Sequence, residues 1–209
     1  MKRLAMPNSL IRLQRLAAHL VRDRRGNAAT EFAMIVPLML VLFFGTVEFS
    51  SGFAVKRKVS MLTGTLGDLV SRYKSVNDTD ITNFNKIADA MLTPYSATPL
   101  NATISELYID PATGTARVQW SRGDSALGVG TPVPVPDVLI AKDAITNAIL
   151  PNQYLIFAEA SYIYVPVIGY VMAKAGVTLS EKSYMKPRLS DCVLLNTASG
   201  NCPKTLIPS

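Results

Sequence analysis

The sequence contains very little histidine and cysteine. Its only histidine is His19, and its two cysteines, Cys192 and Cys202, lie near the C-terminus. Residues 27–209 therefore lack the imidazole that Cys/His metal sites and Ser–His–Asp or Cys–His catalytic arrangements require. They also lack the side chain that most often transfers protons near neutral pH. We accordingly predict a chain without catalytic residues, metal ligands or a cofactor.

Charge is also scarce, and it is unevenly distributed. Charged residues make up 17% of the chain, against about 25% in ordinary soluble domains. The net charge of +6 is carried by residues 1–26, while the rest of the chain holds equal numbers of basic and acidic side chains. A neutral main body has no field that would attract phosphate groups, so nucleic-acid binding is not expected.

What the sequence does contain is one long apolar run. Residues 32–47 read FAMIVPLMLVLFFGTV, carry no charge, and are bounded by Glu31 and Glu48. Sixteen residues fall somewhat short of the ~20 that cross a bilayer, but small and apolar residues extend the run from Asn27 to Val55. The strongly basic stretch before it predicts a cytoplasmic N-terminus and an exported C-terminal domain.

Two alternatives compete with a membrane-spanning helix. The run could be the core helix of a soluble protein, although basic residues on both sides of it argue against this. It could also be a secretory signal peptide. The basic leader is long for a signal peptide, and Lys56, Arg57 and Lys58 follow where small residues would be expected.

The junction between leader and apolar run carries the most specific pattern. It reads RRGNAATEF, with Gly26 after a basic pair and Glu31 at the entrance to the run. A carboxylate at the start of a membrane helix is costly and usually has a partner. A cut after Gly26 would give Asn27 a free ammonium group that could pair with Glu31 of a neighbouring subunit. Alternatively, Glu31 only favours the helix N-terminus through the helix dipole.

Residues 22–72 resemble the N-terminal module of the TadE-like pseudopilins, minor pilins of the tight-adherence (Tad) branch of type IV pili. The matching positions are Gly26, Glu31, Phe32, Pro37, Gly45, Glu48 and Phe49. The resemblance implies that a prepilin peptidase removes the leader between Gly26 and Asn27. It also implies storage in the inner membrane among lipid, other Tad pilins and pseudopilins, and an inner-membrane assembly platform, with no catalytic activity.

The remaining pattern predicts an α+β fold. We expect one helix from Ala28 to Arg72, kinked at Pro37, whose amphipathic second half packs on a periplasmic domain with a small antiparallel sheet and short helices. The expected domains are a basic cytoplasmic leader (1–26), the membrane-spanning and extended helix (27–75) and the periplasmic domain (76–209). Within the last, the expected elements are helices at 81–92 and from 137 to 150, a hairpin of 104–109 with 115–121, and strands at 153–167 and 177–186.

Cys192 and Cys202 enclose nine residues. In an oxidising periplasm a disulfide-closed loop is the natural interpretation, and two free thiols are the alternative. Together these features predict a Tad-type minor pilin that is anchored in the inner membrane. The extracellular pilus is a second location that the subunit could enter. The alternatives are an uncleaved single-pass envelope scaffold of the Tad secretion machine and a membrane-anchored periplasmic enzyme.

Overall fold

The computed structural model describes residues 26–166, 176–197 and 199–206. The basic leader and His19 therefore lie outside the described residues. The chain divides into two compact units, Met1–Val47 and Glu48–Ser209.

Helix α2, Asn27–Ser71, begins and ends within one residue of the predicted bounds, and Pro37 lies inside it. In the first unit its large apolar side chains are exposed; they include Phe32, Met34, Leu38, Val41, Leu42 and Phe43. In the second unit one side of the same helix is buried, at Val55, Val59, Leu62, Leu66 and Val70. These buried residues recur at steps of three or four, which places them on one face of the helix, as the sequence predicts.

The second unit contains an antiparallel sheet of five strands, in the order β4-β3-β2-β5-β6. The strands are β2 (Leu100–Ile109), β3 (Ala116–Gly123), β4 (Pro132–Val133), β5 (Gln153–Tyr164) and β6 (Val177–Met185). Strand β5 lies between β2 and β6, as expected for a strand that is apolar on both faces. A second small sheet pairs β1 (Ser75–Val76) in parallel with β7 (Leu194–Leu195).

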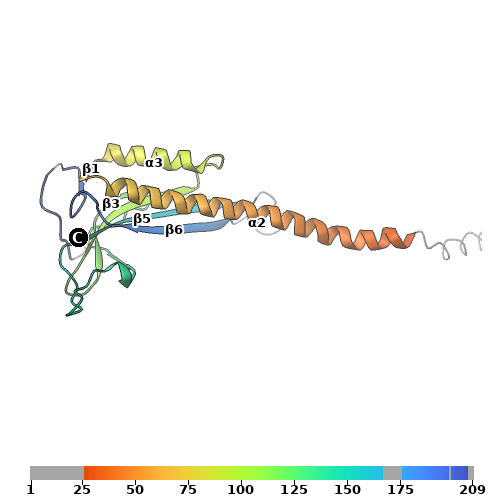
Figure 1. The fold of residues 1–209 in the computed structure, drawn as a ribbon. Helices are drawn as coiled ribbons and strands as arrows, with labels where there is room; N and C mark the ends of the chain where they lie inside the picture. Colours follow the sequence, from red (N-terminus) through yellow and green to blue (C-terminus); the bar gives the residue numbers. More distant parts are fainter. Residues whose placement is uncertain (1–25, 167–175, 198, 207–209) are drawn as a thin grey trace, which may run out of the picture. The chain divides into compact units, whose positions relative to one another are not determined.

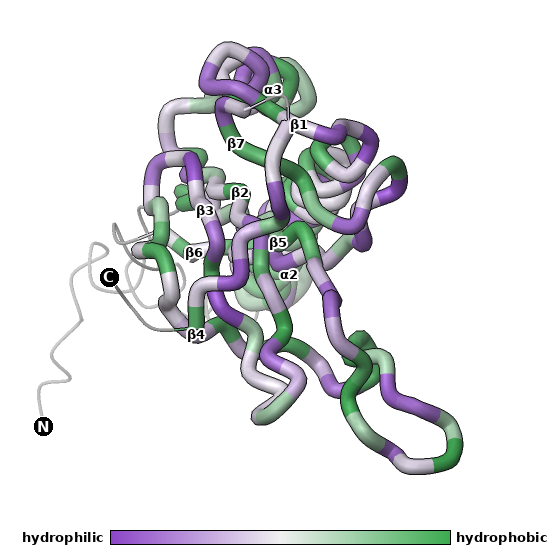
Figure 2. Tube along the Cα trace, turned by 90° about the vertical axis from the view of Figure 1, so that its left-hand side faces the viewer, coloured by the Kyte–Doolittle hydropathy of each residue, from purple (hydrophilic) through white to green (hydrophobic). Residues whose placement is uncertain are grey.

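Two helices cover one face of the large sheet. The second half of α2 and helix α3, Asp78–Leu92, share a hydrophobic core with β2, β3 and β5 (Figure 1). Asn77 and Asp80 form a capping box that begins α3, which satisfies two backbone N–H groups at the helix start. Figure 2 shows hydrophobic positions on β5, which lies beside α2.

Gly67 lets α2 approach the sheet closely. A Cβ atom at this position would lie 3.2 Å from Cγ of Met185 and 3.7 Å from Cβ of Ala158. The sequence suggests only that a glycine weakens the helix here, since glycine costs about 1 kcal/mol relative to alanine in a helix. The structure shows that the residue also permits close packing between layers.

The prediction of a helix from Asp137 to Leu150 is wrong. The chain forms only a short 3₁₀ turn, Asp137–Leu139, and Val138 and Ile145 from the expected apolar face are 89% and 94% exposed. Asp143 instead accepts hydrogen bonds from the backbone of Ile145 and Thr146. Local bonds of this kind compete with helix formation, and an apolar spacing alone does not reveal them.

Candidate functional site

The residues predicted to form the cleavage site lie at the start of α2. Gly26 is exposed, and nothing lies within 4 Å of the position that its Cβ would occupy. Asn27 is the first residue of the helix, and Glu31 follows one turn later with an exposed side chain. The structure thus brings the three predicted residues together on one helical end. Within the part of the chain that the structure describes, nothing sterically requires a glycine at position 26.

A second glutamate, Glu48, which ends the apolar run and is one of the positions of the family resemblance, is hydrogen-bonded to the sheet. The Tyr164 hydroxyl, at the end of β5, donates a 2.7 Å hydrogen bond to Oε1 of Glu48. Burial, together with the hydrogen bond to Glu48, raises the pKa of Tyr164 to about 12. The phenol therefore stays protonated and remains a donor at physiological pH.

Gly52 lies against the ring of Tyr164. A Cβ at position 52 would lie 3.4 Å from Cε1 of Tyr164, so the tyrosine ring rests directly on the helix surface. Glu48 and Gly52 are four residues apart and share one side of α2. That spacing, with a tyrosine at the end of the most apolar strand, is the only sequence signal that could have indicated the contact.

The basic cluster after the apolar run also serves the domain. Lys56 forms a 2.6 Å ion pair with Glu181 and donates to the carbonyl oxygen of Ser180. Lys58 donates to the carbonyl oxygens of Met91 and Thr93, at the C-terminal end of α3. A cation is favourable at that end of a helix. Two of the three basic residues therefore connect α2 to the rest of the second unit.

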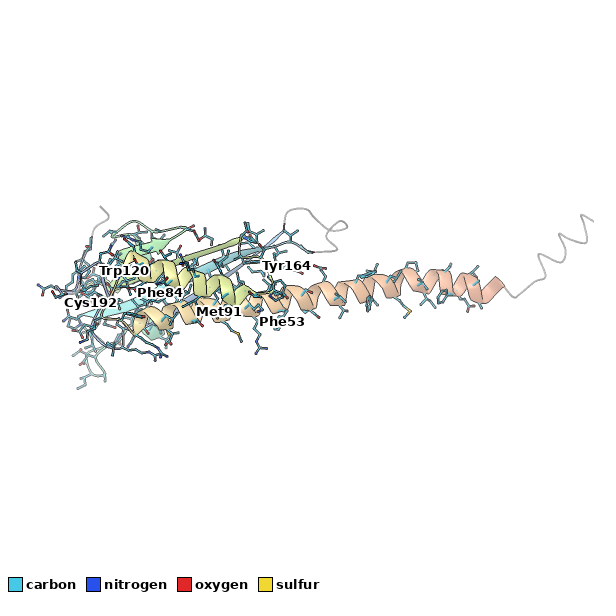
Figure 3. All side chains as sticks on the ribbon, turned by 90° about the horizontal axis from the view of Figure 1, so that it is seen from above. Phe53, Phe84, Met91, Trp120, Tyr164 and Cys192 are labelled. Atoms are coloured by element: carbon cyan, nitrogen blue, oxygen red, sulfur yellow. A yellow bond between two sulfur atoms is a disulfide. The ribbon has the colours of Figure 1, made fainter. Side chains whose placement is uncertain are left out.

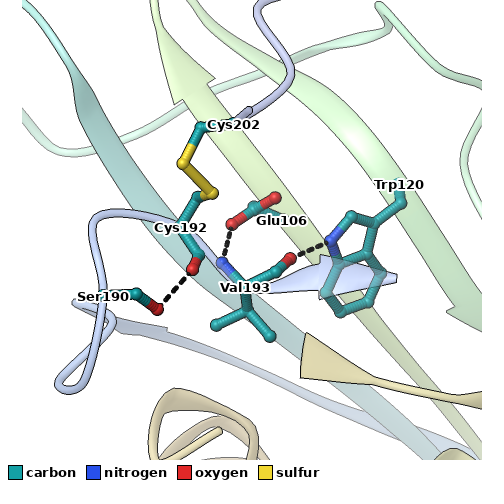
Figure 4. The surroundings of a disulfide bond; sticks show 6 residues. All are labelled: Glu106, Trp120, Ser190, Cys192, Val193 and Cys202. Carbon is teal, nitrogen blue, oxygen red and sulfur yellow. Dashed lines mark hydrogen bonds between the residues drawn. A yellow bond between two sulfur atoms is a disulfide. The ribbon is translucent and has the colours of Figure 1, made fainter. Parts of the chain in front are cut away.

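The two cysteines form a disulfide bond, with their Cα atoms 5.8 Å apart (Figure 4). The segment beside it is held by two side chains of the large sheet. The Val193 N–H donates to Oε1 of Glu106 at 2.5 Å, and the Val193 carbonyl oxygen accepts from Nε1 of Trp120 at 2.7 Å. The bridge thus closes a loop whose first residues are already anchored to β2 and β3.

Glu106 is an unusual residue for a core. It is fully buried, and burial raises its pKa to about 8, while the hydrogen bond from Val193 acts in the opposite direction. Its second oxygen, Oε2, is buried with no hydrogen-bond partner among the described residues. The sequence analysis missed this residue, although its two-residue spacing from buried Ile104 on β2 could have indicated an inward-facing side chain.

The described residues contain one helix, α2, that is long and apolar enough to cross a membrane. The described part of the chain thus has the architecture of a single-helix membrane anchor that continues into an α+β domain. Residues 26–62 match the family model described as TadE-like protein. This match confirms, for the N-terminal module, the resemblance found in the sequence. No curated protein and no solved structure matches the chain.

The TadE-like family is a structural, pilus-related family, and the likeness covers the N-terminal module of the chain. The matched segment begins at Gly26 and contains Glu31, Glu48, Gly52 and Lys56. It therefore covers both the predicted cleavage site and the residues that connect α2 to Tyr164 and Glu181.

Proposed function

We propose that this chain is a minor pilin of a Tad-type adhesive pilus. It is made as a single-pass precursor in the inner membrane, with the leader (1–26) in the cytoplasm, the long helix (27–75) crossing and leaving the bilayer, and the domain (76–209) in the periplasm. The observation that carries this proposal is the TadE-like match, which starts at Gly26 and runs through the exposed apolar part of α2.

Processing is the first step of the proposed function. A prepilin peptidase cuts between Gly26, which is exposed, and Asn27, the first residue of α2. Glycine suits such a site because it allows an enzyme to approach the backbone closely. The cut leaves an ammonium group on Asn27, about 6 Å along the helix axis from Glu31.

Assembly is the second step. The Glu31 carboxylate pairs with the Asn27 ammonium, on its own subunit or on a neighbouring pilin. Such a pair lowers the cost of holding a carboxylate at the entrance of an apolar segment. Its partners are other Tad pilins and pseudopilins and the inner-membrane assembly platform, and the subunit supports assembly of the pilus.

The mass of the membrane-extracted protein tests this proposal. Loss of residues 1–26 is the expected result. An intact precursor in piliated cells would contradict it and favour an uncleaved envelope scaffold of the same secretion machine. Immunogold labelling of sheared pili then distinguishes a subunit within the fibre from one that stays in the membrane.

A further inference from the structure

One end of the large sheet exposes a group of apolar side chains. Ile163, near the end of β5, and Val165, just after the strand, are 48% and 59% exposed, and Val177, at the start of β6, is 54% exposed. Tyr164 pairs with Val177 in the register of the two strands. Gly176 joins the group, since a Cβ there would lie 2.9 Å from Cγ2 of Ile163 and 3.4 Å from Cγ2 of Val165.

This end of the sheet lies beside the part of α2 that contains Glu48 and Gly52, because Tyr164 contacts both. The same stretch of helix exposes two phenylalanines, Phe49 (77%) and Phe53 (63%). Figure 3 shows Tyr164 and Phe53 at one end of the domain and Cys192 at the other.

The apolar side chains occupy several faces at this end. Ile163 points to the side of the sheet opposite Tyr164, because neighbouring residues of a strand alternate between faces. Val165, just after the strand, lies near Ile163, because Cγ2 atoms of both approach the Cβ position of Gly176. Val177 shares the face of its partner Tyr164. Phe49 and Phe53 lie on another side of α2, about 100° around the helix from Glu48 and Gly52.

Polar residues follow on both elements. Along α2 the next exposed residue on the side of Phe49 and Phe53 is Arg57, and along β6 the exposed residues after Val177 are Thr178, Ser180 and Lys182. Arg57 and the polar residues of β6 thus border the apolar group, and on α2 Arg57 separates it from the exposed Met61, one turn further on.

The apolar group lies at the end of the apolar segment of α2. Residues 27–47 precede Glu48 directly in the same helix, and 21 helical residues extend about 31 Å, which matches the ~30 Å hydrocarbon thickness of a bilayer. If Asn27 lies at one boundary of the membrane, Glu48 lies at the other. Phe49 and Phe53 then fall where aromatic side chains are enriched in membrane proteins.

We propose that Phe49, Phe53, Ile163, Val165 and Val177 form a lipid-contacting collar that rests in the periplasmic surface of the inner membrane. This proposal deepens the proposed function and rests on its membrane topology. The collar holds the exported domain against the bilayer while the subunit is stored, and the contact is lost when the subunit leaves the membrane.

A lipid surface fits these residues better than a protein partner. The collar includes both faces of the sheet end and a side of the helix, and polar residues border it. A planar apolar boundary contacts every side of an object at one level. A partner protein would instead be expected to cover one face and to extend along it.

Site-specific fluorescence in vesicles tests the collar. The full chain, with its native disulfide intact, carries an environment-sensitive probe on a single introduced cysteine and is reconstituted in phosphatidylethanolamine–phosphatidylglycerol vesicles with or without brominated acyl chains. V165C and V177C report on the collar. The matched control is I145C, because Ile145 is also apolar and exposed but belongs to a loop connected to Gln153, at the far end of β5, roughly 36 Å away along the strand.

We expect brominated lipid to lower the emission of the probes at positions 165 and 177 at least about twofold and to leave position 145 unchanged, because apolar side chains of an interfacial surface lie at the headgroup–acyl boundary. Equal emission at positions 165 and 145 would overturn the proposal. Crosslinking of position 165 to a second copy of the chain, without quenching, would overturn it in favour of a protein contact.

A probe at L38C separates this proposal from the proposed function. Leu38 lies within the apolar run and is exposed. Quenching at position 38 without quenching at position 165 rejects the collar and leaves the membrane anchor intact. Absence of quenching at position 38 rejects the membrane topology itself.

Discussion

Tyr164 and Glu48, 116 positions apart in the sequence, are joined by a hydrogen bond of 2.7 Å. Glu48 is the first residue after the apolar run, and Tyr164 is the last residue of β5. The bond therefore connects the sheet to the helix at the point where the chain leaves its most apolar segment. With Lys56 and Lys58 it defines how the second unit holds α2.

Replacing Tyr164 with phenylalanine removes this bond and keeps the ring on Gly52. Hydrogen bonds to charged groups stabilise more than neutral ones, so Y164F should lower the free energy of unfolding of the domain by about 1–2 kcal/mol. Denaturation of the full chain in detergent, monitored by near-UV circular dichroism, measures the change in the free energy of unfolding. The control is Y184F, which removes a hydrogen bond to the carbonyl oxygen of Pro134. An equal or smaller loss for Y164F would show that the Glu48 contact contributes little.

The stability of the domain should fall as the pH rises toward 8. Glu106 has a folded-state pKa of about 8 against 4.5 for the free side chain, so the folded state favours the protonated acid. The contribution of Glu106 to the free energy of unfolding is complete below pH 4.5. Between pH 4.5 and about 8 it decreases by about 1.4 kcal/mol per pH unit.

Glu106→Gln removes this ionisation and keeps an oxygen that can accept from the Val193 N–H. The free energy of unfolding of E106Q, measured relative to the native protein, should therefore increase as the pH rises from 5 toward 8. The control is E159Q, which removes a carboxylate that is 37% exposed and faces Lys182. A pH-independent difference between E106Q and the native protein would mean that Glu106 does not titrate in this range.

The disulfide should stabilise the domain without affecting the leader. Closing a loop of this length contributes about 2–3 kcal/mol in the chain-entropy model. The C192S/C202S double variant should unfold earlier by this amount and still lose residues 1–26. Intact mass after alkylation, with and without reductant, checks the bond. Alkylation of both thiols before reduction would contradict it.

Gly26→Val should block processing and leave the precursor in the membrane. The described residues around Gly26 leave space for the new side chain, because none lies within 4 Å of the Cβ position. Gly45→Val is a matched control, since Gly45 is equally open and lies within the apolar part of α2. Mature protein of normal mass from G26V would refute cleavage at this site, whereas a precursor from both variants would indicate a general insertion defect.

Glu31→Gln should be processed and inserted normally but should not associate with partner pilins. Two opposite charges about 4 Å apart attract by roughly 4 kcal/mol at an effective dielectric of 20, before desolvation. Crosslinking in membranes followed by co-purification measures the association. Glu48→Gln is the control, because its amide oxygen can still accept from Tyr164. Unchanged crosslinking of E31Q, with pili intact, would mean that Glu31 only stabilises the N-terminus of the helix and has no role in assembly.

The sequence by itself determined the elements whose pattern is local. Apolar residues at steps of three and four predicted α2 and the buried face that includes Val55 and Leu66, and the apolar character of both faces placed β5 inside the sheet. The junction from Gly26 to Glu31 was also recognisable, because its residues are neighbours in the chain and share one helical end.

Tertiary structure decided the contacts that join distant positions. Glu48 accepts a hydrogen bond from Tyr164, Glu106 accepts one from the Val193 N–H, and Gly67 packs beside Met185. All three contacts depend on the packing of the sheet against other segments. The loop after Asp137 was mispredicted for a related reason: the side chain of Asp143 accepts hydrogen bonds from nearby backbone N–H groups. Val138 and Ile145, which were expected to face the core, are exposed, while Ile149 packs against the core without a helix. Periodicity determines which way a side chain points along its own element, but its partner depends on how the elements pack.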